Sequence, residues 1–268
     1  MGKISQVAKD QYAERVREYK QSTEQILHHE KTVLATIEKD ADQAGYKKIQ
    51  LADERMNLAS LYLLMNRLSL SLLGVKNDGF LNEARRSCYQ SVIYLEDVVS
   101  NVIDGAFSDY SDRLEAIEKL PDEDRYKLSQ KIGFTIQSVE EDFGEGAKWR
   151  WAFVELEGRF TTVTKNLMNL KTMIAGLDPR IPGYEARLEH LRFVKELLKI
   201  SADRYREKYE LATGRMDDFK QAIAFLSALK RIHTVMGETA DADATKKKIE
   251  VWRSKMEADE KRMEQQKR

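Results

Sequence analysis

Hydrophobic residues recur along most of the chain at alternating steps of three and four positions, which is the spacing of one face of a helix. One such stripe runs from Tyr12 to Ile37 and is interrupted only by the polar Thr23 and Glu30. Another runs without interruption over residues 149–174. The pattern predicts long amphipathic helices over residues 5–43, 46–73, 80–103, 114–120, 121–139, 149–174, 184–209, 219–232 and 241–268. No useful stretch alternates in the manner of a strand, so the predicted fold class is all-α.

The second predicted helix has apolar residues on two of its faces. One face includes Ala52 and Met56, and the other carries four leucines at positions 61, 64, 68 and 72. Two apolar faces predict neighbours on two sides, so we expect this helix to lie centrally in its bundle. The apolar run from Leu58 to Val75 contains Arg67 near its middle. That charge favours a buried helix over a membrane span.

Glycine and proline divide the helices into two groups. Gly144 and Gly146 lie close together between two long stripes, and glycine tolerates conformations that other residues avoid. We therefore expect an N-terminal helical bundle over residues 1–143, a hinge over residues 144–146, and a C-terminal bundle over residues 147–268. Both are predicted to be elongated, antiparallel bundles of heptad-patterned helices. The highly charged end of the last helix is expected to fray.

Charge is balanced overall but uneven along the chain. The 45 basic residues equal the 45 acidic ones, which argues against general nucleic-acid binding. Residues 104–145 hold twelve acidic and five basic side chains, whereas residues 146–237 hold seventeen basic and eleven acidic ones. The two stretches either pack side by side within one chain or join copies head to tail, and we favour the first arrangement.

Residues suited to catalysis or metal binding are few and scattered. Cys88 is the only cysteine and lies on an apolar stripe, so it is interpreted as a buried hydrophobic residue. Glu24 and His28 lie one helical turn apart, but no second pair accompanies them. His190 and His233 are isolated and are expected to be satisfied surface or edge residues. We therefore predict no catalytic residues, no cofactor and no metal site.

Positions 28–30 read His-His-Glu within the first predicted helix. Despite their proximity, these three side chains are expected to form an exposed stretch rather than a ligand set.

The segment after the predicted hinge combines bases with tryptophan. Trp149 belongs to the apolar stripe, whereas Trp151 lies about 200° around the helix, on the same side as Val154. Trp151 either covers a neighbouring helix or, with Lys148 and Arg150, forms a contact surface. The candidate interface is therefore Lys148, Arg150, Trp151 and Val154, and the candidate hinge is Gly144 and Gly146.

Long helices without catalytic motifs favour a non-catalytic structural or scaffold protein. Such a protein acts through protein–protein contacts, with a protein partner or with copies of itself. A membrane-surface helical module and a helical peptide-binding adaptor are the alternatives, and an enzyme is the least favoured class. The single cysteine and the absence of an apolar leader favour a cytoplasmic location. An exported chain whose leader has been removed would show the same two features.

Overall fold

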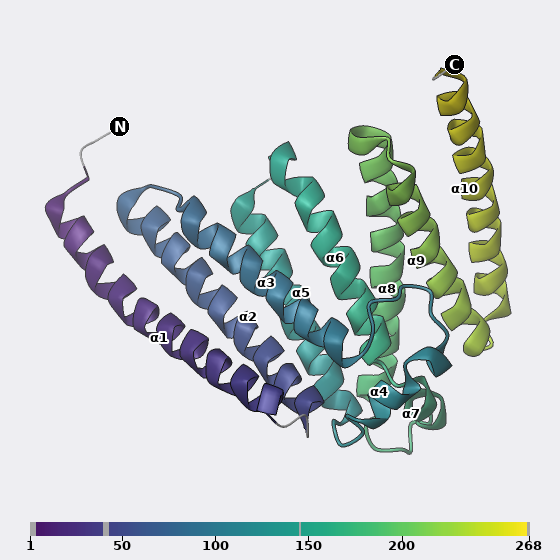
Figure 1. Cartoon of the computed structure of the whole chain (residues 1–268), viewed down its shortest axis with the longest axis horizontal. Helices are drawn as coiled ribbons and strands as arrows, with labels where there is room; N and C mark the ends of the chain where they lie inside the picture. The colour runs from purple at the N-terminus through teal and green to yellow at the C-terminus, as the bar shows by residue number, and fades with distance from the viewer. Residues whose placement is uncertain (1–3, 40–42, 145, 267–268) are drawn as a thin grey trace. The chain divides into compact units, whose positions relative to one another are not determined.

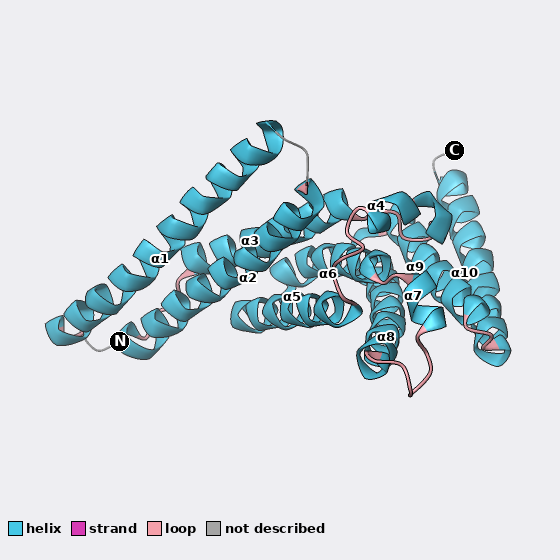
Figure 2. Cartoon of the chain, turned by 90° about the horizontal axis from the view of Figure 1, so that it is seen from below, coloured by secondary structure: helices cyan, strands magenta, loops and turns pink. Residues whose placement is uncertain are grey.

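The structure is a computed structural model that describes residues 4–39, 43–144 and 146–266. The part of the chain described is helical with short connections and contains no strand (Figures 1 and 2), which confirms the all-α prediction. The α-helices are α1 (Gln6–Lys39), α2 (Ala44–Leu68), α3 (Asp78–Val98), α4 (Ser111–Glu115), α5 (Asp122–Phe143), α6 (Ala147–Leu167), α7 (Leu170–Ala175), α8 (Tyr184–Lys208), α9 (Met216–Val235) and α10 (Thr239–Gln266). A π-helical turn, η1 (Ser69–Leu73), extends α2, and a second one, η3 (Tyr209–Thr213), extends α8.

The chain forms two compact units. The first contains the residues up to Ser100, together with Arg113–Lys119 and Lys127–Arg150. The second contains Asn101–Asp112, Leu120–Tyr126 and the residues from Trp151 onward. The units thus change over within α6, after Arg150, and the sequence-based boundary at residues 144–146 remains a prediction.

The core of the first unit lies between α2 and α3, which pack against each other along their length. Small residues at this contact let the two backbones approach: Ala52, Ala59 and Ala84 have no exposed surface. Ser91 donates a hydrogen bond from Oγ to the carbonyl of Ala52 at 2.8 Å. Cys88 is buried in the same layer, as its place on the stripe predicts, and burial raises the pKa of its thiol to about 12.

Glu30 forms the main polar link between α1 and the rest of the first unit. Its side chain is buried, so its predicted exposure is wrong, whereas His28 and His29 are exposed as expected. Arg55 on α2 donates from Nε to Glu30 Oε1 at 2.6 Å and from Nη2 to Oε2. Tyr94 on α3 donates its hydroxyl to Oε1 at 2.5 Å. Glu30, a polar interruption in the apolar stripe of α1, thus binds side chains from both α2 and α3.

Aromatic side chains connect helices in the core of the second unit, where α9 packs against both α8 and α10. Phe219 has no exposed surface and stacks on Tyr209 with ring centroids 4.8 Å apart. The ring of Trp252 from α10 lies 6.1 Å from that of Phe219. Tyr209, Phe219 and Trp252 therefore connect η3, α9 and α10 in one cluster.

The sixth helix is shorter than the sequence predicts. The stripe over residues 149–174 predicts one unbroken helix, but α6 ends at Leu167 and α7 begins at Leu170. Asn169 causes the break, because its side-chain oxygen accepts hydrogen bonds from the backbone of Lys171 and Thr172. Asparagine is a favoured residue at this capping position. Ile174, the last residue of the predicted stripe, is consequently 52% exposed.

Two ion pairs within the second unit join the acidic stretch of the chain to the basic one. Asp104 accepts from Arg231 Nε at 2.9 Å, and Asp122 accepts from Arg187 Nε at 2.7 Å. Both pairs support the interpretation that the two stretches pack side by side within one chain.

Candidate functional site

The most unusual polar side chain of the second unit is Lys165, in the last turn of α6. It is only 6% exposed, and its ammonium lies 5.4 Å from the centre of the Tyr110 ring. Within the ranges that the structure describes, no hydrogen bond or ion pair involves this ammonium. A buried charge normally has a hydrogen-bonding partner of opposite charge, so Lys165 stands out as a candidate for binding something else.

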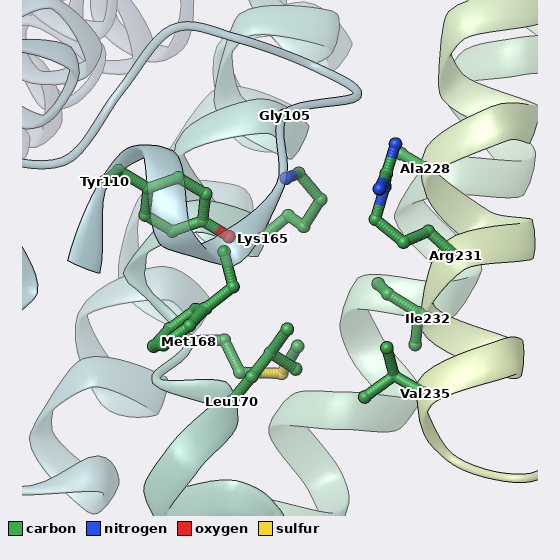
Figure 3. Close-up of a pocket in the computed structure, with 10 residues that line it drawn as sticks. Gly105, Tyr110, Lys165, Met168, Leu170, Ala228, Arg231, Ile232 and Val235 are labelled. Carbon is green, nitrogen blue, oxygen red and sulfur yellow. The ribbon is translucent and has the colours of Figure 1, made fainter.

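A pocket opens beside Lys165, with about 340 Å³ of empty space that is partly open to solvent (Figure 3). Tyr110, Lys165 and Arg231 form its polar side. The rest of the lining is glycine or apolar: Gly105, Phe107, Met168, Leu170, Ala228, Ile232 and Val235. The pocket therefore combines a cationic corner with an apolar wall.

Burial sets the protonation of the polar groups in this pocket. It lowers the pKa of Lys165 to about 8; Asp104 opposes this shift and Arg231 adds to it. Burial also raises the pKa of the Tyr110 hydroxyl to about 12. At neutral pH Lys165 is thus mostly protonated and Tyr110 is neutral. With the Lys165 ammonium and the Arg231 guanidinium in its lining, the pocket is suited to binding an anion.

His233, Glu238 and Asp241 form a second cluster, in which one ligand atom of each lies within 4.8 Å of the others. Glu238 is already paired: Lys195 Nζ contacts its two oxygens at 2.5 and 2.6 Å, and His233 Nδ1 lies 2.6 Å from Oε2. A lysine ammonium that binds both oxygens of the central carboxylate competes with any metal ion. The cluster therefore acts as a polar link between α8 and the turn from α9 to α10.

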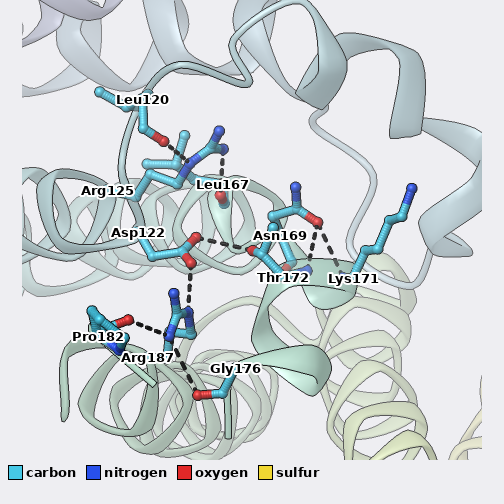
Figure 4. Close-up of polar contacts among 10 residues, drawn as sticks. All are labelled: Leu120, Asp122, Arg125, Leu167, Asn169, Lys171, Thr172, Gly176, Pro182 and Arg187. Atoms are coloured by element: carbon cyan, nitrogen blue, oxygen red, sulfur yellow. Dashed lines mark hydrogen bonds and ion pairs between the residues drawn. The ribbon is translucent and has the colours of Figure 1, made fainter. Parts of the chain in front are cut away.

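A third polar group anchors the start of α5 within the second unit (Figure 4). Arg125 is 2% exposed and donates from Nε to the carbonyl of Leu120 and from Nη1 to that of Leu167, both at 3.0 Å. Asp122 accepts from Arg187 and from the Thr172 hydroxyl. These contacts hold the start of α5 and the end of α6 together.

Both isolated histidines are more buried than the sequence suggests. His190 is 2% exposed and His233 is 5% exposed, so their predicted place at the surface or edge is wrong. Nε2 of His190 lies 3.2 Å from the carbonyl of Thr164, and its ring stacks on that of Tyr126. Apolar neighbours and a single backbone partner make His190 a core residue rather than a site residue.

His190 is expected to make the protein less stable in acid. Burial lowers its pKa from 6.5 to about 4, although the Thr164 carbonyl opposes the shift. Between these two values the unfolded chain binds a proton that the folded chain rejects, so stability is present above pH 6.5 and is lost as the pH falls toward 4. The expected loss is about 2–3 kcal/mol. Urea unfolding of the wild type and His190→Gln at pH 7 and 4.5 measures it, and equal pH dependence in both would contradict it.

The structure does not gather the candidate interface residues on one surface. Val154 is 1% exposed and lies in the core of the second unit, so it cannot present its side chain to a partner. Trp151 is half-buried against the same core, whereas Arg150 is exposed. The side chain of Lys148 lies outside the described residues. Trp149, expected in a seam, is half-buried in the first unit, where its ring centre lies 4.9 Å from that of Phe143.

The two glycines of the candidate hinge have distinct surroundings. Gly144 has φ +77° and its backbone N–H bonds to the carbonyls of Glu140 and Glu141, which makes it the left-handed cap that ends α5. Gly146 is exposed and its carbonyl accepts from the N–H of Trp149 at the start of α6. Glu145 lies outside the described residues, and the hinge itself remains a prediction.

A half-exposed row of leucines follows α2 into η1. It consists of Leu61, Leu64, Leu68 and Leu72, and we refer to it as the leucine row. Leu64 is 43% exposed, and the other three are only partly buried. Both α1 and α3 pack against α2, so this helix has neighbours on two sides as predicted, although Leu64 on its second face and Leu70 on its first are exposed.

Comparison with known proteins places the chain in a family. The sequence model of the TP0443 family matches residues 8–260. The chain belongs to the TP0443 family. No curated protein and no solved structure matches it. The match extends over both units of this TP0443 family member, so the Lys165 pocket and the leucine row both lie within the region that the family defines.

The sequence of this TP0443 family member did not lead us to predict Lys165 or Arg231 as site residues. One signal was present: between Phe160 and Leu170, Lys165 is the only charged residue, and it lies in a stretch of a buried helix. A single charged residue in such a stretch either forms an ion pair with a neighbouring helix or belongs to a binding site. Arg231 had no comparable signal, because it follows another base in an ordinary amphipathic helix.

Proposed function

We propose that this protein is a non-catalytic structural or scaffold protein that acts through protein–protein contacts of its helices. The observation that carries the proposal is the leucine row, which leaves four uncharged side chains partly in water on one helical surface. Exposed apolar residues in a contiguous row favour a contact surface, whereas single ones are ordinary.

The partner that we propose is a protein with an apolar helical face, and a second copy of this chain is the first candidate. Two identical rows can face each other across a two-fold axis, where each contact occurs twice. Because the row itself carries no charge, such pairing brings no like charges together along its centre. We place this assembly in the cytoplasm, since the only cysteine is a buried, free thiol.

The test is the mass of the protein in solution. Leu64→Glu is expected to weaken self-association at least 10-fold in sedimentation equilibrium, because each charge would have to be desolvated at the interface. Its melting temperature should change little, since Leu64 is already 43% exposed. Leu211→Glu is the matched control, because Leu211 is 67% exposed in the other unit.

Other outcomes separate the competing functions. A wild type that stays monomeric at all concentrations and crosslinks to no protein in cells contradicts the proposal. Co-sedimentation with anionic vesicles that Leu64→Glu abolishes would instead support the membrane-surface alternative. Trp151→Ala tests the interface predicted from the sequence. Because Trp151 packs on the second core, we expect that change to lower stability rather than association.

A further inference from the structure

We propose that the Lys165 pocket is a binding site for a small monocarboxylate with a short hydrocarbon chain. The site is independent of the leucine row, and its occupant is a metabolite-sized molecule rather than a protein.

Lys165 and Arg231 give the pocket a cationic corner that favours an anionic ligand. Lys165 and Arg231 contribute two positive charges. Asp104 bonds to Arg231 Nε at 2.9 Å, and Asp109 lies near enough to help raise the pKa of Arg231. The Lys165 ammonium keeps its hydrogen-bond donors, because its described neighbour is the face of the Tyr110 ring. A carboxylate placed between Lys165 and Arg231 would accept hydrogen bonds from the ammonium, which donates to no other acceptor among the described residues.

The apolar wall of the pocket favours an anion that carries a hydrocarbon chain. Met168, Leu170, Ile232 and Val235 line the side opposite the cationic corner, as Figure 3 shows. Such a wall favours a chain of a few carbon atoms and disfavours the hydrated surface of a free phosphate or sulfate. The pocket is partly open to solvent, so a short hydrocarbon chain could lie along this wall and extend outward.

A role in ligand binding also explains why a lysine occupies this buried position. It lies in the last turn of α6, where the helix dipole favours a positive charge. Yet a methionine of similar length would fill the same space without the cost of desolvating an ammonium. Stability alone therefore does not explain a lysine here, and a role in binding does.

The experiment is a titration of the full-length protein with butanoate, followed by isothermal calorimetry and by NMR of the pocket methyl groups. A dissociation constant of about 0.1–5 mM is expected for an anion of this size. Butan-1-amine and butanamide should bind at least 10-fold more weakly, because they lack the charge that Lys165 recognises. Inorganic phosphate is the arm that tests for general anion binding.

Lys165→Met is the decisive variant, and Lys171→Met is its control, because Lys171 is an exposed lysine next to the pocket residue Leu170. We expect Lys165→Met to weaken butanoate binding at least 20-fold while it melts at or above the wild-type temperature, and Lys171→Met to bind normally. Equal binding by Lys165→Met, tighter binding of phosphate than of butanoate, or no heat and no shift at 50 mM butanoate (roughly ten times the weakest expected constant) would each overturn the proposal.

Discussion

Glu30→Ala is expected to lower the free energy of unfolding by about 3–5 kcal/mol, one of the two largest single effects in the molecule. The carboxylate is 6% exposed and binds Arg55 through two bonds and Tyr94 through one. Its removal leaves the Arg55 guanidinium, with a side chain only 19% exposed, without its counter-charge. Urea unfolding monitored by far-ultraviolet circular dichroism measures the change.

Two further variants identify the origin of this loss. Glu24→Ala is the control on the same helix, and as an exposed residue Glu24 should contribute about 0.5 kcal/mol or less. Combining Glu30→Leu, Arg55→Met and Tyr94→Phe removes the whole polar group at once. That triple variant should recover most of the stability, because no buried charge remains unpaired. If Glu30→Ala cost no more than Glu24→Ala, the contact would be a surface ion pair of little consequence.

The stripe of apolar residues was sufficient to predict most of the helices. The seam positions Phe153, Leu156 and Val163 are all fully buried, because a helix that repeats its apolar face every seven residues has one side to cover. The same rule failed after Leu167. There the local capping bonds of Asn169 outweigh continuation of the stripe, and nothing in the apolar spacing reports a side-chain hydrogen bond to the backbone.

Polar residues on buried faces were harder to interpret than apolar ones. Glu30 was recognised as an exception in its stripe, but its partner Arg55 lies 25 positions away on another helix. The environment of Lys165 likewise depends on Tyr110 and Arg231, which only the fold brings together. Periodicity along one helix states which face is buried, but not which residue of a neighbouring helix meets it.

The interface predicted around Trp151 shows the same difficulty in an apolar residue. The angle of about 200° around the helix correctly predicts that Trp149 and Trp151 have different neighbours. Trp149 packs on Phe143 of the first unit, and Trp151 packs on the core of the second. Exposure could not be inferred from that angle, because the residue opposite a seam is exposed only when no second neighbour covers it. The leucine row is the converse case, because a helix with neighbours on two sides still leaves part of an apolar face in water.

Arg125→Met should also lower the free energy of unfolding by about 3–5 kcal/mol. Arg125 is 2% exposed in the first turns of α5, and its guanidinium donates to the carbonyls of Leu120 and Leu167. Methionine fills a similar volume but donates nothing, so it would leave the buried Leu167 carbonyl and the partly buried Leu120 carbonyl without these bonds. The Leu167 carbonyl is the more costly, because it belongs to the last turn of α6 and the N–H four residues on, that of Lys171, bonds to the Asn169 side chain instead.

Arg192→Met is the matched control, since the Arg192 side chain is 65% exposed and pairs with Glu189 one turn away. It should change the free energy of unfolding by about 0.5 kcal/mol or less. Arg125→Lys separates charge from geometry, because one ammonium cannot reach both carbonyls in the way that the planar guanidinium does. It should therefore lose more than half of the stability that Arg125→Met loses. A lysine variant as stable as the wild type would mean that Arg125 contributes through its charge, and the capping of α6 by its two bonds would have to be abandoned.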